Sequence, residues 1–390
     1  MNRVVIYLLA LGVFLTGTVE MVVAGILNVI ATDLNISITL AGQLITGYSL
    51  AFAIGTPILI ALTARMERKK LLIWSLFIFV TGCFISYTSS NYSILMISRV
   101  VLGISAGLFS VIALSSAAKL VPPKKVGSAI GVIGLGFGSA IAFGVPIGIA
   151  ITNIWNWHTI FLVLGIVSLC VMLGLLRLLP RIEGDAPIPF RQQFMVIKNP
   201  VIISALFISL FMCTSNSIML TYIAPFLQDI LHLDATELAY MMLILGIASI
   251  IGSRLGGTGV DKLGTTKMIT SSLLVSGLAL LIIPMFTNPV FLGLVFITIW
   301  MMSIFMTSPA IQSYFIQQAP QTANLVLSLN MTIVHIGTAV GAATGGWIVG
   351  SVSTVKYNPW VAGGAIVIAL FLSIISFSLR KEMVFVKSSQ

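Results

Sequence analysis

Hydrophobic positions along this chain fall into long runs that short polar segments separate. A helix needs about 20 apolar residues to cross a bilayer. By that criterion the pattern predicts about twelve spanning helices: Val4–Ile30, Ala41–Leu62, Leu71–Ser89, Ile94–Ala118, Gly127–Ile151, Thr159–Leu179, Val201–Leu227, Ala239–Gly252, Met268–Phe286, Val290–Ile311, Leu325–Val349 and Trp360–Leu379. The eighth run is short, and we expect it to extend at both ends.

The most polar and proline-rich stretch, Pro180–Pro200, lies between the sixth and seventh runs. We interpret residues 181–199 as a cytoplasmic linker, with Phe190–Ile197 as a short surface helix. The linker divides the chain into an N-terminal half, residues 1–180, and a C-terminal half, residues 200–390. The expected fold class is therefore an all-α membrane protein with twelve transmembrane helices in two pseudo-symmetric six-helix halves.

A faint internal repeat supports this division. When the chain is shifted by 197 positions, Thr39 aligns with Thr236, and Gly55 aligns with Gly252. Basic residues align in the same way, with Arg65 on Lys262 and Lys70 on Lys267. The connection between the second and third helices therefore recurs between the eighth and ninth.

The composition excludes most soluble classes. Of the 390 residues, 58% are hydrophobic and only 8% are charged, whereas soluble domains carry about 25% charged residues. The net charge of +10 does not indicate nucleic acid, because the basic residues sit between the apolar runs. The three cysteines are too scattered for a metal motif, and no nucleotide-binding loop is present. We expect neither an enzyme nor a cofactor.

The basic residues also predict the orientation in the membrane. If the N-terminus is cytoplasmic, almost all lysines and arginines of the loops fall inside, and only Lys356 falls clearly outside. The acidic residues Asp33, Asp229, Asp234 and Glu237 then fall outside. This asymmetry follows the positive-inside rule and places both termini in the cytoplasm.

Three ionisable residues within the runs are candidates for proton coupling. Glu20 is the only carboxylate in the first run, and charged groups at that depth usually face a cavity or a partner in the bundle. A carboxylate that gains and loses a proton can couple proton flow to solute movement. Arg99, in the fourth run, is costly in lipid and must face a cavity or acceptors such as backbone carbonyls of a neighbouring helix. His335, in the eleventh run, is either a second proton site or a neutral residue that bonds between helices.

Four motifs resemble those of the major facilitator superfamily. The segment Gly257–Lys267, with Asp261, Lys262 and Gly264, resembles the loop signature of that family. The first-half copy keeps Arg65 and Arg68 but has Ala64 where the family has aspartate. The segment Leu95–Gly107 around Arg99 resembles the fourth-helix motif of the family, which implies that Arg99 takes part in proton transfer or holds the first helix. Gly144, Pro146 and Gly148 match the fifth-helix motif of exporters, in which proline bends the helix and small residues allow close packing.

The first helix narrows the resemblance further. Glu20 and the segment Gly25–Ser37 are similar to the arabinose-efflux and purine-efflux proteins of the twelve-helix drug/proton antiporter branch, with Asn28 where those proteins often have proline. In this fold the first, fourth, seventh and tenth helices line a central path. The resemblance therefore implies a substrate cavity with contributions from these polar and aromatic residues: Thr18, Gln43, Ser215, Asn216, Tyr222, Trp300 and Asn330.

The resemblance implies a proton-coupled exporter that works by alternating access, and in it Glu20 is expected to carry the coupling proton. Purine bases or nucleosides are the first expected substrates, and multidrug or sugar efflux is the alternative. Two other functions are considered for the same fold: a facilitator or importer, and a non-transporting membrane sensor or scaffold. We expect a monomer in a bacterial-type cell membrane, whose partners are a small-molecule substrate, protons and the lipid bilayer.

Overall fold

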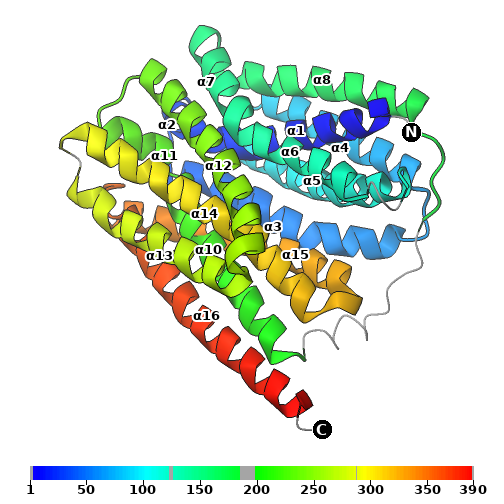
Figure 1. The fold of residues 1–390 in the computed structure, drawn as a ribbon. Coiled ribbons are helices and arrows are strands. Elements are labelled where there is room, and N and C mark those ends of the chain that lie inside the picture. The colour runs from blue at the N-terminus through cyan, green and yellow to red at the C-terminus, as the bar shows by residue number, and fades with distance from the viewer. Residues whose placement is uncertain (1–2, 123–125, 185–197, 287, 389–390) are drawn as a thin grey trace. The chain divides into compact units, whose positions relative to one another are not determined.

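The computed structural model describes residues 3–122, 126–184, 198–286 and 288–388. The predicted surface helix Phe190–Ile197 lies outside the described residues. Twelve helices within the described ranges are long and apolar enough to cross a membrane, which confirms the predicted number (Figure 1). The eighth of them, α12 (Ala235–Leu263), extends beyond the predicted run at both ends, as expected.

The chain divides into two compact units. The first comprises Met1–Pro187, Ile223–Gln228 and Leu233–Gly246, and the second comprises Ile188–Tyr222, Asp229–His232 and Ile247–Gln390. The short segments around residues 223–246 thus belong to the first unit, although they follow the seventh spanning helix in sequence. The predicted half boundaries at residues 180 and 200 stay a prediction.

The first unit contains the first six spanning helices. Its elements are α1 (Arg3–Gly25), α2 (Leu27–Asp33), α3 (Ile38–Thr63), α4 (Arg68–Tyr87), α5 (Tyr92–Lys119), α6 (Val126–Ser139), the π-helical turn η2 (Ala140–Gly144), α7 (Val145–Ile154), α8 (Trp157–Leu178) and the short α11 (Ile223–Pro225). The π-helical turn η3 (Phe226–Ile230) and α12 each run from one unit into the other.

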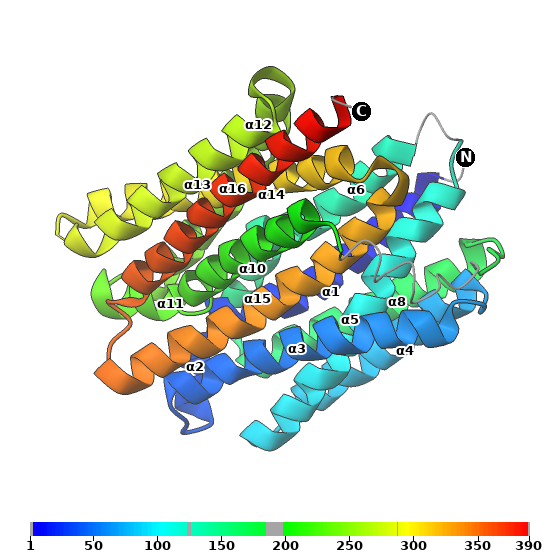
Figure 2. The same cartoon turned by 90° about the horizontal axis from the view of Figure 1, so that it is seen from below.

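The second unit contains the remaining helices. They are α10 (Pro200–Leu220), α13 (Thr265–Ile282), the 3-10 turns η4 (Ile283–Met285) and η5 (Pro320–Thr322), α14 (Val290–Gln318), α15 (Ala323–Val352) and α16 (Asn358–Ser388). Helix α10 packs against both α15 and α16 (Figure 2). Gly337 and Gly341 of α15 allow this approach, because a Cβ atom at either position would crowd the α10 backbone.

Side-chain caps fix where several helices begin. Asn91 accepts a hydrogen bond of 3.0 Å from the backbone N–H of Ile94 and so starts α5. Asn156 caps α8 in the same way through the N–H of Thr159. Each cap satisfies an N–H group that the helix itself leaves without a partner. Asn91 thereby fixes the start of the helix that carries Arg99.

Three predicted runs are interrupted in the structure. The first run divides into α1 and α2 because Ile26 leaves the helical conformation, with φ −117° and ψ 20°. The seventh helix ends at Leu220 instead of Leu227. In the fifth run the irregularity is the π-helical turn η2, and Pro146 stands directly after it in the first turn of α7. Proline is tolerated there because its missing N–H is one that a helix start does not need.

Candidate functional site

The three residues at the centre of the first unit come from three different helices. Glu20 of α1 is 4% exposed, Arg99 of α5 is 0% exposed and Tyr48 of α3 is 0% exposed. Glu20 interacts electrostatically with both Arg99 and Tyr48. We call these three residues the Glu20 cluster. It brings together the carboxylate and the arginine that the sequence singled out.

Arg99 ties α5 to the two neighbouring helices. Its Nη1 atom donates a hydrogen bond of 2.9 Å to the carbonyl oxygen of Val19. Its Nε atom donates a longer bond of 3.4 Å to the carbonyl oxygen of Leu44. Both acceptors are backbone carbonyl oxygens of neighbouring helices, which is the structural role considered for this arginine. A role of Arg99 in proton transfer stays a prediction. Within the described residues, Arg99 Nη2 has no hydrogen-bond partner, so the guanidinium keeps a free donor.

Tyr48 completes the cluster from the α3 side. The Arg99 guanidinium carbon lies 4.5 Å from the centre of its ring, an arrangement that stabilises a buried cation. The Tyr48 hydroxyl points to the carbonyl oxygen of Thr16 at 3.5 Å. A tyrosine within an apolar run is usually a packing residue, so the hydropathy pattern alone does not place Tyr48 beside Arg99.

Close packing of α3 on α5 holds Tyr48 against Arg99. A Cβ atom at Gly103, one turn after Arg99, would overlap with the carbonyl oxygen of Tyr48. A Cβ atom at Gly107 would overlap with the side chain of Thr56. The glycines of the fourth-helix motif are therefore contact points with α3, and they set the distance between the arginine and the tyrosine ring.

The fifth-helix motif packs on the other side of α1. A Cβ atom at Gly144 would overlap with Thr18, and one at Gly148 would overlap with Val22. Thr18 and Val22 flank Glu20, so η2 and α7 support the helix that carries the carboxylate. Thr18 is 2% exposed, and its hydroxyl donates a hydrogen bond of 2.8 Å to the carbonyl oxygen of Phe14 in its own helix. Its role in a substrate cavity stays a prediction.

The net charge of the Glu20 cluster depends on whether Glu20 is protonated. Buried charges are costly unless they are paired. An ionised Glu20 balances the charge of Arg99, and a protonated Glu20 leaves that charge uncompensated. Because Arg99 is bonded to Val19, the residue directly before Glu20, a change in this balance acts on the backbone of α1. A change in the protonation of Glu20 would thus change the electrostatic balance beside the backbone of α1.

Predicted cavity residues in the second unit are also buried. Ser215, Trp300, Asn330 and His335 are each at most 8% exposed, and Asn216 is half-buried. Within the described residues, four of these side chains carry a buried polar atom with no hydrogen-bond partner: Ser215 Oγ, Asn216 Oδ1, Trp300 Nε1 and Asn330 Oδ1. Such atoms are available to a ligand or to water. Tyr222 instead donates to the carbonyl oxygen of Ala342 at 3.1 Å.

The remaining predicted residues lie at helix ends or on partly open faces. Gln43 of α3 is half-buried. Asp261 and Lys262, in the last turn of α12, are exposed, and Gly264 follows with φ 82°, a conformation that favours glycine. In the first-half loop Arg65 is exposed, while Arg68 is buried and its backbone N–H bonds to the carbonyl oxygen of Ile182 at 2.9 Å. This bond ties the loop to the start of the linker.

One contact, just beyond the end of α1, could not be expected from the sequence. Asn28 of α2 donates a hydrogen bond of 2.8 Å from Nδ2 to Oε1 of Gln228 in η3. The two residues are 200 positions apart and both belong to the first unit. Hydropathy patterns carry no information on such a pair, because both side chains are neutral amides in largely apolar surroundings.

Comparisons with known proteins agree with this fold. The family model described as Major Facilitator Superfamily matches residues 9–342. The chain is 34% identical, over 97% of its length and 96% of the relative, to the "Uncharacterized MFS-type transporter YbcL" of Bacillus subtilis. It is 30% identical, over 96% of its length and 95% of the relative, to the "Inner membrane transport protein YdhP" of Escherichia coli.

A solved structure has the same fold. The crystal structure of a D-xylose-proton symporter superposes with a TM-score of 0.79 at 17% identity, covering 95% of this chain and 97% of the symporter. At that identity the likeness concerns the fold.

Proposed function

The chain belongs to the major facilitator superfamily of secondary transporters, which are not enzymes, and from that premise we propose that it is a proton-coupled exporter of small organic solutes. It is a multi-pass membrane protein, and one relative is named as an inner membrane transport protein. A bacterial cell membrane with both termini in the cytoplasm is the proposed location. A sensor or scaffold is disfavoured because the relatives are named as transporters or transport proteins.

The observation that carries the proposal is the burial of Glu20 beside Arg99 and Tyr48. A membrane protein keeps such a charged group at a cost of several kcal/mol, and ionisable residues within spanning helices usually serve transport or proton relay. Glu20 is the residue of the cluster that can exchange a proton, because an arginine stays protonated. We therefore assign the coupling proton to Glu20.

The coupling follows from the bond between Arg99 and α1. We propose that Glu20 binds a proton from the outside, where the proton concentration is higher in an energised cell, and releases it to the cytoplasm. Protonation removes the attraction between Glu20 and Arg99, while the Arg99–Val19 bond continues to hold the backbone of α1. The two charge states thus favour two positions of α1, which is what alternating access requires.

The direction of transport rests on the fifth-helix motif. Gly144, Pro146 and Gly148 match the pattern of exporters in this family, and their close contacts with α1 supply a packing face on which that helix can move. An importer remains the alternative direction. Export lowers the solute concentration in the cell, so net flux distinguishes the two.

Purine bases or nucleosides are the first proposed substrates. A purine needs aromatic faces for stacking and amide groups for its edge. Tyr222 and Trp300 supply aromatic rings, and Asn216 and Asn330 supply amide oxygens without partners among the described residues. Multidrug or sugar efflux is the second candidate. A protein of the same fold is named as a D-xylose-proton symporter, so a sugar is included among the solutes to be tested. His335 is proposed as a second proton site.

The test is uptake of radiolabelled adenine into everted membrane vesicles, in which export appears as uptake. The wild-type chain is expected to accumulate adenine when respiration acidifies the vesicle interior, and a protonophore is expected to abolish the accumulation. Glu20→Gln is expected to abolish it as well. If adenine is not accumulated, a fluorescent cationic dye and arabinose are tested in the same vesicles, which decides the substrate class separately from the mechanism. Protonophore-insensitive transport of all three would end the proposal.

A further inference from the structure

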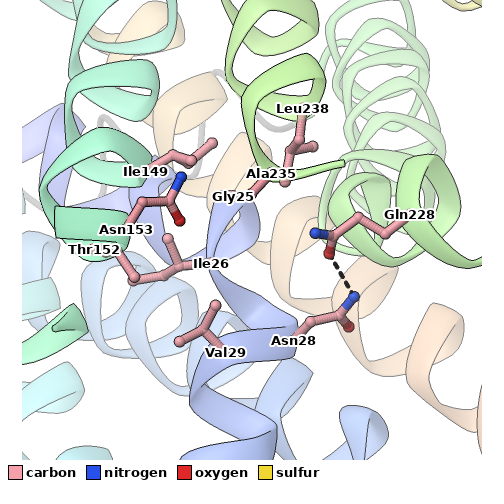
Figure 3. Close-up of a pocket in the computed structure, with 10 residues that line it drawn as sticks. All are labelled: Gly25, Ile26, Asn28, Val29, Ile149, Thr152, Asn153, Gln228, Ala235 and Leu238. Atoms are coloured by element: carbon pink, nitrogen blue, oxygen red, sulfur yellow. Dashed lines mark hydrogen bonds between the residues drawn. The ribbon is translucent and has the colours of Figure 1, made fainter. Parts of the chain in front are cut away.

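A small hollow lies where α2, α7, η3 and the start of α12 meet. It encloses about 40 Å³, and its lining includes Asn28, Thr152, Asn153 and Gln228 (Figure 3). A water-sized group needs about 10–15 Å³ of such space, so the hollow has room for about three of them. All of its lining residues belong to the first unit. The hollow can therefore hold one polar end of a solute.

Two polar atoms at this hollow have no partner among the described residues. Thr152 is 7% exposed, and its Oγ1 atom is buried without a hydrogen bond. The Oδ1 atom of Asn28 is also buried without one. A buried polar group without a partner is unfavourable, so a ligand or water that supplies the missing hydrogen bonds stabilises the site.

Gln228 fixes which atom of Asn28 remains available. The hydrogen bond of 2.8 Å between Asn28 Nδ2 and Gln228 Oε1 uses the amide nitrogen of Asn28. The carbonyl oxygen, Oδ1, is then the free atom of that side chain (Figure 3). Gln228 is therefore a positioning residue, and Asn28 presents an acceptor.

The lining of the hollow also disfavours a charged ligand. The ten residues that line the hollow are all neutral: glycine, alanine, leucine, valine, isoleucine, threonine, asparagine and glutamine. Burying an ion there would leave its charge uncompensated, at a far higher cost than burying a neutral group. An N–H or O–H donor on an uncharged solute matches the carbonyl oxygen of Asn28 and the hydroxyl of Thr152.

The hollow and the Glu20 cluster share the first predicted run, because Glu20 lies on α1 and Asn28 lies on α2. Asn28 follows Glu20 by eight residues and lies beyond the break at Ile26, which separates α2 from α1. This direction leads towards Asp33, at the end that the charge pattern predicts to be outside.

We propose that Asn28 and Thr152 form a second, outer binding site for the N–H or O–H donors of an uncharged polar solute, and that Gln228 orients Asn28. The site rests on the proposed export function and narrows it to neutral substrates such as nucleobases or sugars. Asn28 Oδ1 accepts one hydrogen bond from the solute, and Thr152 Oγ1 accepts or donates another. In the absence of solute the same positions suit water.

Equilibrium binding to the purified full-length chain in detergent tests the site without any ion gradient. The probes are radiolabelled adenine and radiolabelled arabinose, two uncharged solutes with different donors. Thr152→Val removes the hydroxyl at nearly constant volume and is expected to weaken binding of the accepted probe about threefold to tenfold, the effect of one hydrogen bond. Thr152→Ser, which keeps a hydroxyl, is expected to fall between Thr152→Val and wild type.

A matched control and a positioning variant sharpen the test. Thr81→Val makes the same exchange on the exposed face of α4, away from the hollow, and is expected to bind as wild type does. Gln228→Leu removes the acceptor that orients Asn28 and is expected to weaken binding.

The outcomes separate this inference from the proposed function. Binding of neither probe to the wild-type chain, or equal affinities of wild type and Thr152→Val, would overturn the outer site. Proton-driven export with a Glu20 requirement would stand in that case. Conversely, a chain that binds adenine through Thr152 but shows no proton-driven transport would keep the site and end the coupling proposal.

Discussion

Arg99 donates a hydrogen bond of 2.9 Å from Nη1 to the backbone carbonyl oxygen of Val19, the residue directly before Glu20. This bond attaches a fixed positive charge on α5 to the backbone of α1 at the position of the buried carboxylate. A change in the charge of Glu20 therefore acts on a helix that is already held at one point. The predictions below follow from this connection and from the packing that maintains it.

Replacement of Arg99 tests the connection itself. Arg99→Lys keeps the positive charge but loses the planar group that reaches two carbonyl oxygens and covers Tyr48. We expect transport to fall at least about tenfold and the free energy of unfolding to fall by about 1–3 kcal/mol, the scale of a lost hydrogen bond to a charged group. Arg99→Met removes the charge as well and is expected to cost about 3–5 kcal/mol, as when one partner of a buried pair is removed.

Thermal unfolding of the purified variants, together with vesicle transport, provides the measurement. Equal melting temperatures for wild type, Arg99→Lys and Arg99→Met would contradict the structural role of the arginine.

The contact between Gly103 and Tyr48 predicts a second effect. Gly103→Ala places a methyl group on the carbonyl oxygen of Tyr48 and must push α3 from α5. We expect a loss of about 1–3 kcal/mol, which is typical of overpacking, and a matching fall in transport. Gly131→Ala is the control, since no atom lies within 4 Å of a Cβ there. A larger loss for Gly131→Ala than for Gly103→Ala would refute the packing argument.

The close approach of α7 to α1 predicts that a larger residue at Gly148 reduces transport. Gly148→Leu would displace Val22 and with it the segment of α1 around Glu20. We expect a fall in the transport rate at nearly unchanged expression, measured by vesicle uptake and immunoblotting. Gly134→Leu serves as the control because its Cβ position is open. Wild-type rates in Gly148→Leu would show that this face does not limit the movement of α1.

A bond between Trp157 and Asp33 predicts a modest effect on stability. The indole Nε1 of Trp157 donates to Asp33 Oδ2 at 2.9 Å, which ties the start of α8 to the end of α2. Trp157→Phe keeps an aromatic ring and removes the donor, so we expect a loss of about 1 kcal/mol, reduced by the partial exposure of the pair. Asp33→Asn retains an acceptor and is expected to lose less. The melting temperatures of the two variants decide the order.

The spanning helices were predictable because they depend on hydrophobicity summed over about 20 residues. Their interruptions were not predictable in this way, because Ile26 is an ordinary apolar residue and hydrophobicity summed over a run does not mark one residue that leaves the helical conformation. Pro146 did mark the irregular part of the fifth helix, but the structure places the π-helical turn before it. Local sequence therefore located the helices better than it located the breaks.

The candidate site was predictable where a charge stands in an apolar run. Glu20 and Arg99 were identified in this way, since each is costly in lipid. The contribution of Tyr48 and the Asn28–Gln228 pair depend on contacts between distant segments, which hydropathy and spacing do not encode. The role of His335 as a second proton site and the binding of a purine by the cavity residues stay predictions from the sequence.

Transport by proteoliposomes that contain purified Glu20→Gln tests the central claim most directly. Two assays are compared with wild type: accumulation of the identified solute driven by an imposed pH gradient, and exchange of labelled for unlabelled solute without a gradient. We predict that Glu20→Gln loses gradient-driven accumulation and its dependence on pH but keeps exchange, because glutamine preserves the shape of the side chain and cannot release a proton. Gradient-driven accumulation at the wild-type level in Glu20→Gln would contradict the assignment of the coupling proton to Glu20.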